Sequence, residues 1–304
     1  GELTGILRGM GQVPAEDRPR IGQLVNATRE KLEEAIAQRA REIGRLEKER
    51  QLKKEALDVT LPGRTRSAGS LHPMNLVLDD LLNIFTGMGF EVVEGPEVEY
   101  DHYNFELLNL PKNHPARDAQ DTFYIDDNVV LRTHTSPVQA RIMTTRKPPI
   151  RIVCPGRVYR ADEVDATHSP VFHQLEGLVI DEHITIGDLR GTLDMFAQRL
   201  FGEGTKTRFR PSFFPFTEPS AEVDMTCAGC KGAGCRMCKG TGYIEVLGSG
   251  MVNPKVLRLC GIDDKKYSGF AFGIGIERLA ILKYSVPDMR YLYENDLRFL
   301  AQFR

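Results

Sequence analysis

The sequence predicts an α+β fold, with a mainly antiparallel sheet flanked by helices and an N-terminal helical coiled-coil arm. Three observations favour this architecture. Residues 72–304 contain many strand-like segments but few β-α-β alternations, which disfavours a parallel sheet. Residues 1–60 contain a long, charged helical pattern, which indicates the arm. Residues 61–71, rich in Gly, Ser and Arg, are typical of a linker between the two parts.

The bulk composition is that of an ordinary globular protein. The 304 residues, 41% hydrophobic and 27% charged, can form one large core or two domains. A net charge of −2 argues against general coating of nucleic acid, and no run of about 18 apolar residues could span a membrane. The chain opens with Gly1 and has no signal peptide, so we expect a cytoplasmic protein whose natural sequence begins upstream.

The helix of the arm is predicted from residue 18 to about residue 57, after a Gly-rich, turn-prone start. Apolar positions recur at alternating spacings of four and three, which gives one narrow seam among charged residues. Such a seam needs a partner helix, and the alternative is a solvated arm. The seam consists of Ile21, Val25, Thr28, Leu32, Ala35, Arg39, Ile43 and Leu46.

The second part begins near residue 72. An amphipathic helix is predicted over 74–88, ended by glycines, and strand 90–93 follows it. Residues 100–121, rich in Asn, His, Pro and Asp, are predicted to be irregular. The later predicted elements are strand 129–132, a helix from about 136 to 145, strands 157–160 and 171–180, helix 186–201, strands 208–210, 221–224, 243–247 and 269–275, and helices 275–284 and 288–302.

The hairpin of residues 157–180 gathers side chains suited to binding. Arg160 ends its first strand, and Gln174 and Glu176 lie on its second strand near the aromatic Phe172. A guanidinium, an aromatic face and a carboxylate can together hold a phosphate, a flat base and an ammonium group. The alternative is a surface hairpin with ordinary salt bridges.

A strand-turn-helix at residues 270–279 carries the pattern G-x-G-x-x-R. Gly273 and Gly275 precede Arg278, which stands where a dinucleotide-binding fold has its third glycine. Because Arg278 lies one turn into the helix, its side chain can point back over the sheet toward a phosphate. The alternative is that the glycines only allow the strand and the helix to pack closely.

Four cysteines within twelve residues mark an insert at residues 225–243. Cys227, Cys230, Cys235 and Cys238 occur in two copies of C-x2-C-x-G-x-G that begin eight residues apart. The repeat resembles the cysteine repeats of DnaJ-type chaperones. Two such turns offer four thiolates to a tetrahedral ion, so we expect a structural zinc site. The alternative is a loose loop with reduced or oxidised thiols.

With these motifs the chain resembles the class II aminoacyl-tRNA synthetases. The helix and strand of residues 72–96, the hairpin and the G-x-G-x-x-R turn occur in the order of that class's three motifs. The resemblance is to the alpha subunits of bacterial phenylalanyl-tRNA synthetases. It covers nearly all of residues 60–304 and implies a class II catalytic domain over 72–304. The arm is similar to the second half of that family's tRNA-contacting coiled coil. The strings that carry the resemblance are Thr133–Pro137, Phe172–Gly177, Phe214–Ser220 and Phe270–Gly273.

The resemblance implies an ATP site and a phenylalanine site. Arg160 corresponds to the arginine that holds the α-phosphate, Phe172 to the ring that stacks on adenine, and Arg278 to the arginine that grips the far phosphates. Asp162, where glutamate is usual, and His168 complete the implied ATP site. The implied phenylalanine site consists of His134, Ser136, Gln139, Gln174, Glu176, Phe214, Phe216, Ala271 and Gly273.

Within the phenylalanine site, Glu176 is implied to pair with the ammonium group, although as an isolated residue it would more often be structural. Phe214 and Phe216 would contact the ring, and the small Ala271 would leave space for it; two such phenylalanines are otherwise typical of core packing. Glu218 matches a magnesium ligand at the contact with the beta subunit, and taken alone it would be a surface acid.

The implied activity is formation of phenylalanyl-adenylate from phenylalanine and ATP with Mg²⁺, followed by transfer to the 2′-hydroxyl of phenylalanine tRNA. The implied assembly is an α2β2 heterotetramer with a beta subunit. The alternatives are a synthetase for another amino acid and a catalytically inactive, synthetase-like binding or regulatory subunit. The aromatic pocket argues against the first, and the retained Arg160, Glu176 and Arg278 argue against the second.

Overall fold

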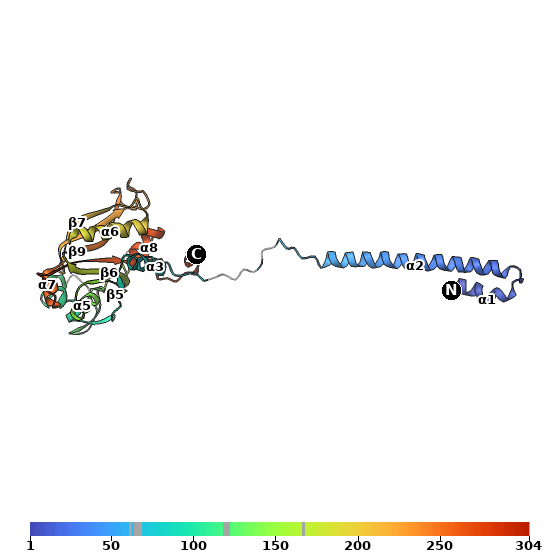
Figure 1. Ribbon diagram of the computed structural model, residues 1–304, viewed down its shortest axis with the longest axis horizontal. Helices are drawn as coiled ribbons and strands as arrows, with labels where there is room; N and C mark the ends of the chain where they lie inside the picture. Colours follow the sequence, from blue (N-terminus) through green and yellow to red (C-terminus); the bar gives the residue numbers. More distant parts are fainter. Residues whose placement is uncertain (61–62, 64–68, 118–121, 166–167, 304) are drawn as a thin grey trace. The chain divides into compact units, whose positions relative to one another are not determined.

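The computed structural model describes residues 1–60, 63, 69–117, 122–165 and 168–303. The chain divides into two compact units, Gly1–Ala68 and Gly69–Arg304 (Figure 1). Within the described ranges, no helix is long and apolar enough to cross a membrane.

The first unit is a pair of helices. Helix α1 (Glu2–Gly9) and the 3-10 turn η1 (Met10–Gln12) lead into the long helix α2 (Arg18–Lys54), and α1 packs alongside its first part (Figure 1). The side chain of Arg18 closes the connection by donating hydrogen bonds to the carbonyls of Gly11 and Val13. The predicted turn-prone start is therefore wrong for residues 2–9, because packing on α2 offsets the low helix propensity of the two glycines in α1.

The apolar seam of α2 is mostly exposed. Val25 is the one buried residue of this helix. Farther along the seam, Leu32, Ile43 and Leu46 are 47%, 45% and 48% exposed. Within the described residues of this unit, α1 therefore covers the seam only near its start. The rest of the seam is exposed, as expected for a narrow apolar seam whose full-length partner helix is not among these residues.

The second unit is built on a seven-stranded sheet in the order β1-β5-β6-β10-β9-β8-β7. Every neighbouring pair is antiparallel except β1 and β5, which confirms the predicted mainly antiparallel sheet. The bounds of the strands are β1 Glu91–Val92, β5 Ile150–Tyr159, β6 Val171–Glu182, β7 Thr207–Phe214, β8 Thr217–Thr226, β9 Tyr243–Val252 and β10 Tyr267–Gly275.

Three helices cover one face of this sheet: α3 (Pro73–Thr86), α6 (Ile186–Phe201) and α8 (Ile276–Tyr284). Their apolar sides meet the strands around Phe85, whose ring stacks on Phe196 at 5.3 Å and on Phe272 at 5.1 Å between centroids. The predicted start of α6 is confirmed, since Thr185 and Asp188 form a reciprocal capping box.

A second apolar cluster lies on the other face of the sheet. Here η2 (Glu106–Leu108), α5 (Ser136–Thr145) and α7 (Pro254–Leu259) contribute Leu107, Val138 and Val256 against Leu178 of β6. A small sheet of β2 (Val98–Tyr100), β4 (Val129–Leu131) and β3 (Tyr124–Asp126) belongs to the same unit. The candidate site described below opens on this face.

Two further predictions about local structure are wrong, both in the second unit. The segment predicted to be irregular contains α4 (Asp101–Asn104), η2 and η3 (Pro115–Arg117), because a buried ion pair of 2.6 Å between Arg117 and Asp101 fixes it. The predicted helix 288–302 is two short turns, η4 (Met289–Leu292) and α9 (Leu297–Leu300). Asn295, with φ of +55°, breaks the helix, and Asp296 caps a new one by accepting from the Arg298 backbone N–H.

Candidate active site

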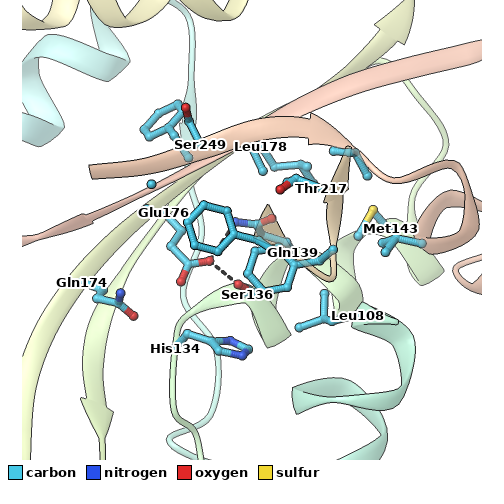
Figure 2. A pocket seen from close by; sticks show the side chains of 18 of the residues that line it. Leu108, His134, Ser136, Gln139, Met143, Gln174, Glu176, Leu178, Thr217 and Ser249 are labelled. Carbon is cyan, nitrogen blue, oxygen red and sulfur yellow. Dashed lines mark hydrogen bonds between the residues drawn. The ribbon is translucent and has the colours of Figure 1, made fainter. Parts of the chain in front are cut away.

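A cavity of about 320 Å³ lies against the sheet between β6, β10, α5 and the turn from β7 to β8 (Figure 2). Arg160 lines it, just past the end of β5. All nine residues predicted for an amino-acid site line it as well, although they come from four separate stretches of the sequence. They are His134, Ser136, Gln139, Gln174, Glu176, Phe214, Phe216, Ala271 and Gly273.

Glu176 is the central polar group of the cavity and is only 5% exposed. Its carboxylate accepts hydrogen bonds from the Ser136 hydroxyl at 2.5 Å (Figure 2), the Thr135 backbone N–H at 3.1 Å and the Gln139 amide at 3.0 Å. These three donors come from the start of α5, so the first turn of that helix holds the carboxylate in place. Burial nevertheless raises the pKa of Glu176 to about 7. A cationic ligand in the cavity would relieve that cost.

His134 and Gln174 bring buried polar atoms that have no partner among the described residues. Neither ring nitrogen of His134 nor the side-chain oxygen of Gln174 forms a hydrogen bond there. Burial, together with the charges of Arg160 and Arg132, lowers the pKa of His134 to about 3, so its imidazole is neutral at physiological pH. Buried polar atoms normally have partners, and these atoms are therefore available to a polar ligand.

The rest of the cavity is aromatic and aliphatic. The rings of Phe214 and Phe216 lie nearly parallel, 5.9 Å apart, and the His134 ring lies 6.2 Å from Phe216. Gly248 leaves room for this wall, since a Cβ there would lie 2.9 Å from Phe214. A polar end and an aromatic end suit a small molecule that carries an ammonium group and an apolar ring.

Sequence reasoning missed the aliphatic end of the cavity. It is formed by side chains from η2, α5, β9 and α7, which are far apart in the chain and occur in no shared motif. They are Leu108, Met143, Val252 and Val256.

Arg160 connects the cavity to the predicted nucleotide side. Its Nε donates to the Thr133 carbonyl at 3.2 Å, and its guanidinium carbon lies 5.0 Å from the centre of the half-buried Phe172 ring. Burial lowers the pKa of Arg160, although an arginine stays charged at any physiological pH. Among the described residues no carboxylate forms an ion pair with it. The guanidinium is therefore a largely desolvated cation beside an aromatic face.

The other predicted nucleotide residues lie outside the cavity lining. Arg278, in the first turn of α8, is exposed, and its Nε donates to the Glu245 carbonyl at 3.2 Å. Asp162 is half-buried after the end of β5, and the exposed His168 lies 2.9 Å from the carboxylate of Asp165, which raises its pKa. The structure thus brings Arg160 and Phe172 together and leaves the other three at the periphery.

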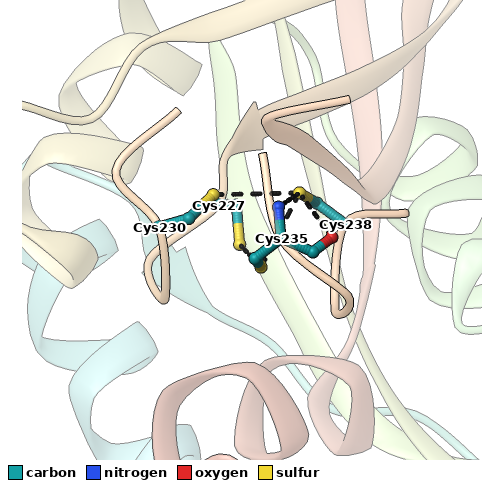
Figure 3. Close-up of side chains that lie close together, drawn as sticks. All are labelled: Cys227, Cys230, Cys235 and Cys238. Carbon is teal, nitrogen blue, oxygen red and sulfur yellow. Dashed lines mark hydrogen bonds between the residues drawn. The ribbon is translucent and has the colours of Figure 1, made fainter. Parts of the chain in front are cut away.

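The four predicted cysteines converge. Their sulfurs all lie within 4.8 Å of one another (Figure 3). Cys227 lies 3.7 Å from Cys235, and Cys230 lies 3.8 Å from Cys238, so equivalent positions of the two repeats pair across the cluster. Backbone N–H groups point at the sulfurs of Cys230 and Cys238, and they lower the pKa of Cys238 to about 6, which favours a thiolate. This donor set suits a tetrahedral zinc ion.

Glycines make this double turn possible. Gly234 and Gly242, which end the two repeats, have φ of +92° and +76°. A Cβ at Gly234 would lie 2.7 Å from the carbonyl oxygen of Gly240, and one at Gly242 would lie 2.4 Å from that of Gly232. The last glycine of each repeat therefore packs against the preceding motif glycine of the other repeat: Gly234 against Gly240, and Gly242 against Gly232. This close backbone contact explains why the motif has glycine at both positions of x-G-x-G.

Glu218 lies apart from both sites. It is exposed in β8 at the turn after Phe216, where its carboxylate accepts from the Asn253 amide at 3.3 Å. In the described part of the chain, the cysteines form the only group of three or more His, Cys, Asp or Glu side chains with converging ligand atoms. Glu218 therefore offers one ligand, and a magnesium ion there would need others from outside this chain.

Comparison with known proteins gives consistent results over the whole chain. The family profile described as tRNA synthetases class II core domain (F) matches residues 56–303, and the profile described as aminoacyl tRNA synthetase class II, N-terminal domain, matches residues 1–52. The chain is 61% identical to the phenylalanine–tRNA ligase alpha subunit of Caldanaerobacter subterraneus subsp. tengcongensis and 59% identical to that of Acetivibrio thermocellus. Both alignments cover 100% of this chain and 89% of the relative.

Among solved structures, the fold is similar to that of the pyrrolysyl-tRNA synthetase from Desulfitobacterium hafniense. The TM-score is 0.55 over 73% of this chain and 74% of the other, at 16% identity. At that identity the similarity concerns the fold alone.

Proposed function

Because the chain belongs to the class II aminoacyl-tRNA synthetases and, within them, to the phenylalanine–tRNA ligase alpha subunits, we propose that it activates phenylalanine with ATP and transfers it to the terminal ribose of phenylalanine tRNA. The observation that carries this proposal is the cavity, where a buried carboxylate at one end faces an aromatic wall at the other.

Phenylalanine would bind with its ammonium group at Glu176. Its ring would lie against Phe214 and Phe216, above the small Ala271, which lines the cavity beside Gly273. The buried atoms of His134 and Gln174 that lack a partner among the described residues would complete the polar contacts around the amino and carboxylate groups. Ser136 and Gln139 would orient Glu176. Each aromatic pair adds about 0.5–1.5 kcal/mol beyond burial.

ATP would bind beside this pocket, with its adenine on Phe172 and its α-phosphate at Arg160. A carboxylate oxygen of phenylalanine attacks the α-phosphorus, the bond to the bridging oxygen breaks, and its electrons leave with diphosphate. Arg160 neutralises charge that develops on the α-phosphoryl group, so catalysis rests on positioning and electrostatics. Arg278 would hold the far phosphates, with Asp162 and His168 at the rim. The tRNA 2′-hydroxyl would then lose its proton and attack the acyl carbon, and the bond to the phosphate oxygen would break so that AMP leaves.

Magnesium would neutralise phosphate charge when bound with ATP. Glu218 would contribute a ligand to a magnesium ion shared with the beta subunit, in keeping with its exposure at a turn.

The alpha subunit name of the relatives implies a beta subunit as partner, and we propose an α2β2 assembly in the cytoplasm. The helical arm, residues 1–60, would contact tRNA, and linker 61–71 would join it to a catalytic domain over 72–304.

The proposed zinc site in the insert 225–243 leads to a prediction about composition and stability. Purified protein should contain about one zinc per chain, because four thiolates satisfy one tetrahedral ion. Cys227 and Cys238 also belong to the main apolar core, so loss of the ion should loosen that core. Replacing Cys230 by serine should remove the zinc and lower the melting temperature by about 5 °C or more. Cys260→Ser, a buried thiol outside the cluster, is the control and should keep the metal.

The proposed activity is tested by ATP–diphosphate exchange with the alpha subunit in complex with the beta subunit. Exchange should depend on phenylalanine and should be much weaker with tyrosine or leucine. Exchange with another amino acid and none with phenylalanine would contradict the substrate. Tight binding of phenylalanine and ATP without exchange would favour the inactive, regulatory alternative instead.

A further inference from the structure

A buried acid next to Arg278 has partners that the proposed reaction does not use. Glu277, in the first turn of α8, is only 3% exposed. Its carboxylate accepts from the His173 backbone N–H at 2.9 and 3.0 Å, from the His173 ring at 2.8 Å and from the Tyr293 hydroxyl at 2.6 Å. In the described part of the chain no arginine or lysine forms an ion pair with it, so these donors alone satisfy the buried charge.

The contact lies where the sheet ends. Strand β10 pairs with β6 up to Gly275 opposite Gln174, and the chain then turns into α8. The next N–H of β6, that of His173, has no strand partner on this side and donates to Glu277 instead. The carboxylate therefore continues the hydrogen bonding of β6 beyond the last register pair.

His173 lies between two residues of the proposed active site. Successive side chains of a strand point to opposite faces, so Phe172 and Gln174 share the face of the cavity while His173 points to the α8 side. This alternation agrees with the observed contacts, since Gln174 lines the cavity and Phe172 lies beside Arg160. A displacement of His173 would therefore shift the proposed adenine contact and the proposed phenylalanine contact together.

We propose that Glu277 is a positioning residue, which fixes the β6 segment carrying Phe172 and Gln174 relative to the helix carrying Arg278. The inference rests on the proposed function of those three residues. Tyr293, 16 residues after Glu277, adds the C-terminal segment to the same carboxylate, so β6, α8 and the C-terminal segment meet at one buried group.

The test is steady-state ATP–diphosphate exchange with the Glu277→Gln variant in complex with the beta subunit. Glutamine keeps the size of the side chain but loses the charge, and its amide nitrogen cannot accept the His173 hydrogens. The KM values for ATP and for phenylalanine should both rise roughly tenfold or more, since hydrogen bonds to a charged group are lost. Tyr293→Phe, which removes one of the donors, should raise them by about two- to fivefold.

The control is Asp101→Asn, which breaks the buried ion pair with Arg117 away from the cavity. It should lower the melting temperature but leave both KM values unchanged.

If Glu277→Gln also lowers the melting temperature without changing either KM, Glu277 has only a structural role and the inference is overturned. If Glu277→Gln does not fold, His173→Ala decides, since it removes only the ring donor; unchanged KM values would also overturn the inference. Absence of exchange in the wild-type complex would contradict the proposed function instead.

Discussion

Replacing Glu176 by glutamine is expected to lower kcat/KM for phenylalanine in the exchange reaction by about a hundredfold or more. The carboxylate is buried and accepts hydrogen bonds from three neutral donors. The ammonium group of the proposed ligand would supply the positive charge that pairs with it. Removing one partner of a buried ion pair leaves the other charge uncompensated, which costs roughly 3–5 kcal/mol. The KM for ATP should change much less, because the nucleotide is proposed to bind at Arg160 and Phe172.

The dependence on pH distinguishes this role from a structural one. Burial raises the pKa of Glu176 to about 7 from an ordinary 4.5, so in the unliganded protein the group becomes neutral as the pH falls below 7. The KM of the wild type for phenylalanine should rise in that range, whereas the glutamine variant should lack this dependence. Because the pKa of Glu176 is higher in the folded than in the unfolded state, its protonation between pH 7 and 4.5 stabilises the unliganded fold. Weaker phenylalanine binding in this pH range therefore cannot result from unfolding caused by protonation of Glu176.

A matched control and a contrary outcome complete the test. Glu99→Gln alters another buried carboxylate, paired with Arg141 at 2.6 Å, that does not line the cavity, and it should leave the KM for phenylalanine unchanged. An equal kcat/KM for the wild type and Glu176→Gln, or the same pH profile in both, would show that Glu176 does not bind the ammonium group.

The polar half of the candidate site could be predicted from the sequence because it lies on short, continuous strings. In β6 the period of two places Gln174, Glu176 and Leu178 on one face, and a strand of this length has little freedom to place them otherwise. The strings at Phe214–Phe216 and Ala271–Gly273 are likewise local, and the antiparallel register brings them to the same cavity.

The parts that could not be predicted depend on contacts between distant residues. His173 and Glu277 are 104 residues apart, and nothing near either one indicates the other. The aliphatic end of the cavity comes from four elements, and the sequence predicts neither η2 nor α7 among them. In the C-terminal segment, the helical pattern of 288–302 was misleading because Asn295 adopts a left-handed conformation that local periodicity does not reveal.

Replacing Arg160 by alanine is expected to lower kcat of the exchange reaction by about a thousandfold, the largest effect of any substitution considered. The guanidinium is half-buried, lies over Phe172 and has no carboxylate partner among the described residues. Such a cation is suited to bind a phosphate whose negative charge grows in the transition state. In other enzymes a single positioned donor raises the rate of the chemical step roughly 10²–10³-fold, and an arginine on a transferring phosphoryl group raises it up to about 10⁵-fold. Arg160→Lys should recover part of this rate, because it keeps the charge but loses the planar fork.

Stability separates this catalytic role from loss of structure. Since Arg160 is a partly desolvated charge without an ion pair among the described residues, its removal should leave the melting temperature unchanged or raise it while activity falls. Arg157→Ala is the matched control: this arginine lies three residues earlier, its side chain is 55% exposed, and it pairs with Glu97 at 3.1 Å outside the cavity. It should retain nearly full activity. A decrease in kcat for Arg160→Ala no larger than that for Arg157→Ala would exclude Arg160 from the phosphate site and with it the proposed chemistry of the cavity.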